Sequence, residues 1–422
     1  MGSKANRALA IRVFSLSTLA LVPVAASAQS GPPASVAFHS SRDGNNNIYV
    51  MNPDGSVPTR LTTDASNDQR ADISPDGRQI VFASSRNDHF ELFVMNADGS
   101  GVRQLTSTPI IPPPATAIAN SWPRWSPDGE WIAFQSTSDF HTNDVVPVQV
   151  WVIHPDGTGL TRITNFTTNQ FPAWSPDGTR LAVRRDVDVY IIDLVGGAPP
   201  LRLTTEGPLN QMPSWSPDGT RIAFMSTREP GNYPSVFVMN ADGTNQVDLT
   251  PKPNLFKGTW SSRAPAWSPN GKKIYFTAIR DLTGEQVYVM DADGGNPRAL
   301  TTDGVNAEAT VRHVTPPAIT NISATPNVLW PPNNRMTRVS VDVAVSDNSD
   351  PMPACQITDV ASNESIAGSA WEMQGPLTLN LAADRHGAGP GRTYTLTVTC
   401  TNSSELSSIA MVTVNVPHDR GK

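Results

Sequence analysis

A short phrase recurs through most of this sequence and constrains the fold more than any other feature. The phrase Ser-Pro-(Asp/Asn)-Gly occurs five times, and a short apolar run, a loop, a second apolar run and a Gly-containing hairpin follow each copy. Successive copies are 52, 49, 41 and 52 residues apart. A period of this length is typical of one four-stranded blade of a β-propeller. The copies begin at Ser74, Ser126, Ser175, Ser216 and Ser268.

The copy counts predict how such a ring closes. The hairpin of the Asn-Ala-Asp-Gly type occurs six times, from Met51–Gly55 to Met290–Gly294, but the Ser-Pro turn occurs only five times. The first blade therefore begins directly in a second strand, Ser35–His39, and a spare strand, Glu308–Val314, follows the last repeat. If the spare strand completes the first blade, the chain forms an all-β, six-bladed propeller over residues 34–314, without exposed sheet edges.

The repeated turns and aromatic residues have structural explanations. Asp-Gly supplies the positive φ that a tight hairpin needs, so its repetition requires no catalytic role. The Trp that precedes most Ser-Pro turns is interpreted as a packing residue between blades. Three Arg-Asp pairs follow equivalent strands and are interpreted as either structural ion pairs or loop locks: Arg42-Asp43, Arg185-Asp186 and Arg280-Asp281.

The five turns and the Val-Met-Asn-Ala-Asp-Gly phrases at 94–99 and 238–243 resemble the WD-like propeller repeats of the TolB family. Related repeats occur in the propellers of prolyl oligopeptidases and dipeptidyl peptidases. The resemblance covers about residues 34–314 and implies the fold, together with a periplasmic partner such as the peptidoglycan-associated lipoprotein. We expect no counterpart of the family's N-terminal α/β domain, because only about six residues separate the expected cleavage site from the first strand.

The N-terminus has the features of a secretory signal peptide. Basic residues precede an apolar stretch from Val13 to about Val24, and Ala26-Ser27-Ala28 is a small-residue cleavage site. The stretch is too short for a membrane anchor, so we predict a signal peptide at 1–28 and a periplasmic or extracellular protein that is not integral to the membrane. Cleavage changes the formal charge from −7 to −10, which disfavours nucleic acid as a partner. A monomer is expected by default.

The C-terminal part, residues 316–418, lacks the propeller phrase and contains strands with period-two alternation. This pattern predicts an immunoglobulin-like β-sandwich. Its two cysteines, Cys355 and Cys400, are the only ones in the chain and predict a buried disulfide, with two free thiols as the alternative. The acidic residues near one strand end are interpreted as a solvated turn, with a calcium site as the alternative. These residues are Asp342, Asp347, Asn348 and Asp350.

No complete catalytic constellation is found in the sequence. Gly-x-Ser-x-Gly, His-Glu-x-x-His, Cys-x-x-Cys and phosphate-loop motifs are absent, and the seven histidines show no ligand spacing. We therefore expect a protein that is not an enzyme and has no cofactor, apart from the calcium alternative.

The predicted blade topology places the variable, Pro-bearing loops, such as 107–121 and 251–262, on one face of the ring. Loops on a rigid scaffold are the usual place for recognition. The first strand of each blade starts there, beside the central channel, and six polar residues at its start are the candidate binding residues. Ordered water in the channel is the alternative occupant. The six residues are Gln69, Ser121, Gln170, Gln211, Arg263 and Glu308.

The sequence thus favours an exported binding or scaffold protein that holds a protein or peptide partner in the cell envelope. One alternative is a metal-dependent propeller hydrolase or lyase with its site in the channel, for which Asp68, Asp72, Asn306 and Glu308 are the first suspects. The other is carbohydrate or cell-surface adhesion through the C-terminal domain.

Overall fold

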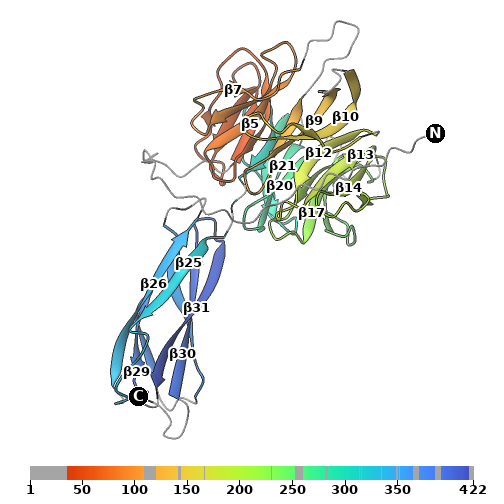
Figure 1. The fold of residues 1–422 in the computed structure, drawn as a ribbon. Coiled ribbons are helices and arrows are strands. Elements are labelled where there is room, and N and C mark those ends of the chain that lie inside the picture. The colour runs from red at the N-terminus through yellow and green to blue at the C-terminus, as the bar shows by residue number, and fades with distance from the viewer. Residues whose placement is uncertain are drawn as a thin grey trace, which may run out of the picture. The chain divides into compact units, whose positions relative to one another are not determined.

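The computed structural model describes residues 36–108, 120–140, 144–165, 167–229, 231–251, 260–280, 284–312, 314, 316–333, 335–347, 350, 352–364, 370–384 and 391–417. The predicted signal peptide lies outside these ranges. The regular elements of the described residues are all strands (Figure 1), so none of these ranges contains a helix that could cross a bilayer. The chain divides into two compact units, residues 1–313 and 314–422.

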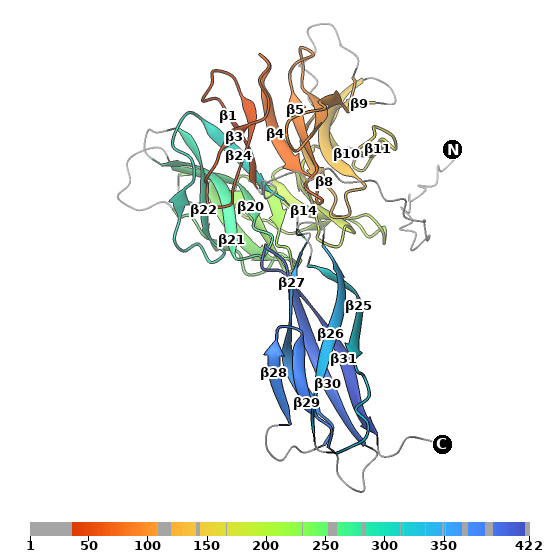
Figure 2. The same cartoon turned by 90° about the vertical axis from the view of Figure 1, so that its left-hand side faces the viewer.

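The described part of the first unit forms six antiparallel sheets of four strands, which we number as blades 1 to 6 (Figure 2). From the innermost strand outward, blade 1 consists of β24 (Asn306–Val311), β1 (Val36–Ser40), β2 (Asn47–Met51) and β3 (Thr59–Arg60), and blade 2 consists of β4 (Asp68–Ile73), β5 (Gln79–Ser84), β6 (Glu91–Asn96) and β7 (Arg103–Gln104). In the same order, blade 3 consists of β8 (Ser121–Trp125), β9 (Ile132–Asp139), β10 (Asp144–Ile153) and β11 (Thr161–Arg162), and blade 4 consists of β12 (Asn169–Trp174), β13 (Arg180–Arg185), β14 (Asp188–Asp193) and β15 (Leu201–Arg202). Blade 5 consists of β16 (Asn210–Trp215), β17 (Arg221–Ser226), β18 (Ser235–Asn240) and β19 (Val247–Asp248), and blade 6 consists of β20 (Trp260–Trp267), β21 (Lys273–Arg280), β22 (Glu285–Asp291) and β23 (Arg298–Ala299).

The ring closes through strands from its two sequence ends. β24 pairs antiparallel with β1, so that Val311 lies opposite Val36 and Asn306 lies opposite Ser40. The innermost strands pack in the order β4, β8, β12, β16, β20, β24 and again β4. This is the closure that the copy counts predict, although the closing strand begins two residues earlier than expected and ends at Val311.

The interfaces between blades are apolar, and the Trp of the Ser-Pro turn lies in them. Trp125 of blade 3 packs with Val81 and Leu92 of blade 2, and Trp267 of blade 6 packs with Ala223 and Val238 of blade 5. The interpretation of these tryptophans as packing residues is confirmed.

Each blade contains a Leu-Thr pair, which is Ile163-Thr164 in blade 3, and the Thr of this Leu-Thr pair makes a hydrogen bond inside the blade. The Thr hydroxyl accepts the backbone N–H of an apolar residue of the third strand, at 2.9–3.0 Å in all six blades. Where an acidic or amide residue immediately precedes that apolar residue, the hydroxyl also donates to it, as Thr204 does to Asp188 and Thr301 does to Gln286. The pair therefore anchors the short outer strand to the blade.

The described part of the second unit consists of two antiparallel sheets around an apolar core, which fits the predicted sandwich. Core residues such as Val339, Leu379, Tyr394, Leu396 and Val414 are fully buried. The four-stranded sheet has the order β25 (Ala318–Thr325), β26 (Met336–Ser346), β29 (Thr378–Ala382) and β28 (Trp371–Gly375), and the other sheet has the order β27 (Ala354–Ser362), β30 (Gly391–Thr401) and β31 (Ser407–Pro417).

The predicted disulfide between Cys355 and Cys400 is confirmed. It joins residues that lie directly opposite each other on β27 and β30, within one sheet. Cys400 is buried, but Cys355 is partly exposed. The bridge is therefore less buried than predicted, because it lies beside the core of the sandwich and not across it.

Candidate functional site

The innermost strand of every blade carries a β-bulge, and one non-glycine residue of each bulge has φ between 50 and 58°. Each of these residues lies where the pairing with the neighbouring strand shifts register. Left-handed backbone is uncommon for non-glycine residues, so its recurrence marks a built feature. The six bulge residues are Arg70, Trp122, Phe171, Met212, Ala264 and Glu308.

The bulge residues converge on the channel. Trp122, Phe171, Met212 and Ala264 come from four different blades and pack in a single apolar cluster. Residues from separate blades can meet in this way only if they point toward the common axis. The bulges therefore place the bulge side chains inside the ring, near the start of the innermost strands.

A cavity of about 360 Å³ opens at this level of the channel. It combines aromatic and methionine side chains with amides, hydroxyls and charges of both signs. The lining residues are Arg70, Ser121, Trp122, Gln135, Thr137, Val148, Gln170, Phe171, Met212, Arg263 and Glu308.

Four of the six predicted binding residues, Ser121, Gln170, Arg263 and Glu308, line this cavity. Gln69 and Gln211 are not among its lining residues. Gln211 instead accepts a hydrogen bond from Arg184 Nη1 at 3.0 Å.

Sequence reasoning missed the aromatic and methionine part of the site. The prediction selected the residue immediately before the bulge in five of the blades. The bulge inserts one residue into the strand, so in each of these blades the next residue is the one in the left-handed conformation. Arg70, Trp122, Phe171 and Met212 were missed for this reason. A signal was present, because large or charged residues recur three positions before the end of the strand.

The apolar side of the site is built around Trp122. The Phe171 ring meets the Trp122 ring edge-to-face, with centroids 4.7 Å apart. The guanidinium carbons of Arg70 and Arg124 lie 5.2 and 5.6 Å from a Trp122 ring centroid, within cation–π range. Trp122 is therefore held rigidly, and Phe171 is the more accessible of the two rings.

The charged side of the site is built around Glu308. Its Oε2 atom lies 3.4 Å from Arg70 Nε and 3.8 Å from His39 Nδ1. None of these three buried atoms has a hydrogen-bond partner among the described residues. Burial lowers the pKa of His39, which favours the neutral imidazole. Arg263 forms an ion pair with Glu285. Glu308, Arg70 and Arg263 thus bring charges of both signs to the cavity wall.

Of the four residues suspected for a metal-dependent enzyme, Glu308 lines the channel cavity and the other three make hydrogen bonds elsewhere. Asp68 accepts from Arg86 at 3.2 Å, Asp72 accepts the Trp125 backbone N–H at 2.8 Å, and the Asn306 carbonyl accepts from Arg42 at 2.8 Å. In the described ranges, no three His, Cys, Asp or Glu side chains are close enough together to hold a metal ion.

The acidic residues of the C-terminal unit stabilise a loop. Asp347 accepts from the Asp350 backbone N–H at 2.7 Å and from Asn402 Nδ2 at 2.9 Å, and Asp350 accepts the Ser403 N–H at 2.9 Å. Asp342 is exposed on β26. Asn348 lies outside the described residues, as do residues 109–119 and 252–259 of the long loops.

Sequence comparison agrees with the architecture. The TolB β-propeller domain family matches residues 20–143 and 121–264, which together are more than half of the chain. This chain belongs to the TolB β-propeller domain family. No curated protein sequence matches the chain.

Solved structures show the same TolB-type fold at low sequence identity. TolB from Acinetobacter baumannii is 19% identical, with a TM-score of 0.54, over 66% of this chain and 67% of that protein. Hydrazine synthase from Kuenenia stuttgartiensis is 14% identical, with a TM-score of 0.50, over 66% of this chain and 46% of that protein. Because differently named proteins share this fold, the likeness identifies the propeller and leaves function to the site.

Proposed function

We propose that this TolB-family chain is an exported, non-enzymatic binding or scaffold protein of the cell envelope. It holds a protein or peptide partner at the channel mouth and the adjoining loops of the propeller. The signal-peptide features of residues 1–28 support a periplasmic or extracellular location, and the family supports a protein partner. The propeller over residues 34–314 and the immunoglobulin-like domain over 316–418 are proposed as separate domains, and the protein as a monomer.

The composition of the channel cavity is the observation that carries this proposal. Trp122, Phe171 and Met212 offer an apolar surface, and rigid aromatic residues of this kind are frequent anchors of protein interfaces. Ser121 and Gln170 offer the hydroxyl and amide groups that pair with a peptide backbone. At ~30 Å³ per water-sized volume, about 360 Å³ accommodates on the order of twelve non-hydrogen atoms, which corresponds to one or two side chains.

Partner capture with matched variants tests the proposal. The protein starting at Gln29 is immobilised and exposed to an envelope extract, and each captured protein is then purified for affinity measurement. Phe171→Ala removes an accessible ring from the cavity, and we expect it to weaken the partner on the order of tenfold or more. Leu201→Ala is the control, because Leu201 is 55% exposed on the short outer strand β15 of blade 4.

The two variants give opposite expectations. Loss of affinity in Phe171→Ala, with affinity unchanged in Leu201→Ala, supports the channel mouth as the binding surface. Equal affinity of both variants and the unaltered protein for every captured partner would refute it.

A further inference from the structure

Five of the six blades share an aromatic pair that blade 4 lacks. The second strand contributes a Phe and the third strand places an aromatic ring directly opposite it, with centroids of 5.6–6.0 Å in four blades. In blade 4 the Phe position is Val183, opposite Tyr190. The five pairs are Phe38–Tyr49, Phe82–Phe93, Phe134–Trp151, Phe224–Phe237 and Phe276–Tyr288.

An arginine caps this pair in four of those blades. In blade 1, the Arg42 guanidinium lies 4.9 Å from the Tyr49 ring and donates to the Asn306 carbonyl at 2.8 Å. In blade 5, Arg228 lies 4.7 Å from Phe237 and donates to the Asn210 carbonyl at 3.1 Å. Arg86 and Arg280 cap blades 2 and 6 in the same way. Of the three arginines predicted to lock loops, Arg42 and Arg280 therefore have a structural role, through ring contacts and hydrogen bonds.

Blade 4 departs from this arrangement at the arginine as well. Its loop between β13 and β14 is short. Arg185 follows Val183 by two residues, whereas the capping arginine of the other blades follows the Phe by four residues. Arg185 lies 5.5 Å from the Tyr190 ring, and its Nε donates to Thr167 Oγ1 at 3.0 Å. No described residue forms an ion pair with Arg185, and none donates a hydrogen bond to the side-chain carbonyl of Asn169, the equivalent of Asn306 and Asn210.

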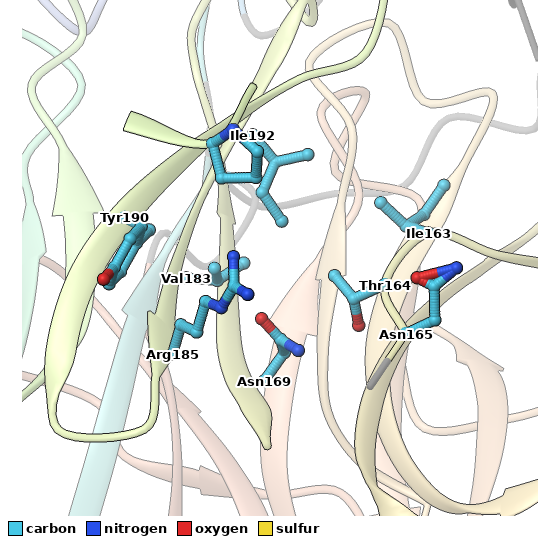
Figure 3. A pocket seen from close by; sticks show the side chains of 9 residues that line it. Ile163, Thr164, Asn165, Asn169, Val183, Arg185, Tyr190 and Ile192 are labelled. Carbon is cyan, nitrogen blue, oxygen red and sulfur yellow. The ribbon is translucent and has the colours of Figure 1, made fainter. Parts of the chain in front are cut away.

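These differences leave a cavity of about 240 Å³ between blades 3 and 4. Val183, Ile163 and Ile192 form its apolar wall, and Arg185, Asn169 and Tyr190 also line it. Figure 3 shows the Arg185 side chain between Tyr190 on one side and Thr164 and Asn165 on the other. The cavity is distinct from the channel site, with which it shares no lining residue.

We propose that this cavity is a binding site for a small aromatic carboxylate. The apolar body of the ligand takes the space that the Phe ring fills in other blades, against Val183 and Tyr190. Its carboxylate pairs with the Arg185 guanidinium, which forms charge-assisted hydrogen bonds with planar anions. At ~30 Å³ per water-sized volume, about 240 Å³ accommodates on the order of eight non-hydrogen atoms, close to the size of benzoate.

Ligand-observed NMR and thermal shift with benzoate test the proposal on the whole mature protein. Benzoate is expected to bind more tightly than benzyl alcohol, which has the same ring without the charge. Arg185→Gln is expected to weaken benzoate on the order of tenfold and to leave benzyl alcohol unaffected. Arg180→Gln is the matched control, because Arg180 lies at the other end of β13 and does not line the cavity.

A second variant restores the residue of the other blades. Val183→Phe is expected to fill the cavity, to raise the melting temperature and to abolish benzoate binding. The proposal is overturned if Arg185→Gln binds benzoate as well as Arg180→Gln does. It is also overturned if Val183→Phe folds and still binds benzoate, or if benzoate does not bind the unaltered protein.

Discussion

The Thr hydroxyl of each Leu-Thr pair is expected to contribute strongly to propeller stability, and Thr204 of blade 4 permits a quantitative test. Thr204 is fully buried. Its Oγ1 accepts the Val189 backbone N–H at 3.0 Å and donates to Asp188 Oδ1 at 2.8 Å. Thr204→Val preserves the shape of the side chain and removes both hydrogen bonds.

The expected cost follows from what remains unpaired. A buried backbone N–H without an acceptor costs roughly 1–3 kcal/mol, and a hydrogen bond to a charged group contributes roughly 1.5–3 kcal/mol. Asp188 keeps its contacts with Arg202 and Asn210, which softens the second loss. We therefore expect Thr204→Val to lower the free energy of unfolding by about 3 kcal/mol.

Equilibrium unfolding in urea, followed by tryptophan fluorescence, measures this change. Thr161→Val is the control, because Thr161 is partly exposed and its hydroxyl donates only to the Gly159 carbonyl. Such a substitution is expected to stay within about 0.5 kcal/mol. If Thr204→Val costs no more than Thr161→Val, the Leu-Thr pair is not the anchor described here.

Three further changes test other parts of the structure. Burial raises the pKa of Asp72 to about 6, so protonation of Asp72 stabilises the fold as the pH falls from about 6 toward about 4. The unaltered protein should therefore gain stability between about pH 7.5 and pH 5, and Asp72→Asn should reduce that gain by ~1 kcal/mol in urea unfolding. Gly77 has φ +71° and a Cβ there would lie 2.5 Å from the Arg312 guanidinium, so Gly77→Ala should cost ~1–3 kcal/mol in the same assay. The disulfide spans 45 residues, and Cys355→Ala with Cys400→Ala should destabilise the second unit by about 4 kcal/mol in calorimetry.

The blade architecture was predictable because it is encoded by repetition. Each Ser-Pro turn and each Asp-Gly hairpin specifies one local connection, and their unequal counts indicated that strands from the two sequence ends would complete one blade. The pairing of β24 with β1 follows from that count alone. The disulfide was predictable because Cys355 and Cys400 are the only cysteines of the chain.

The channel lining was only partly predictable, because the position of a residue at the start of a strand does not reveal a bulge farther along it. One inserted residue moves every following side chain to the other face. Trp122 and Phe171 therefore lie in the channel although the choice of polar residues at the strand start selected Ser121 and Gln170, and the cavity includes both kinds of residue. The replacement of the Phe by Val183 in blade 4, unlike the channel lining, is visible in the sequence alone when the repeats are aligned with one another.

Site-specific photo-cross-linking shows directly whether the channel mouth binds the partner. A photoreactive amino acid replaces Gln170 in the channel cavity or Val247, which is 53% exposed on the outer strand β19. If the channel mouth binds the partner, position 170 gives a discrete cross-linked product that Phe171→Ala weakens, and position 247 gives none. Cross-linking from position 247 alone, or equally from both positions, would contradict it.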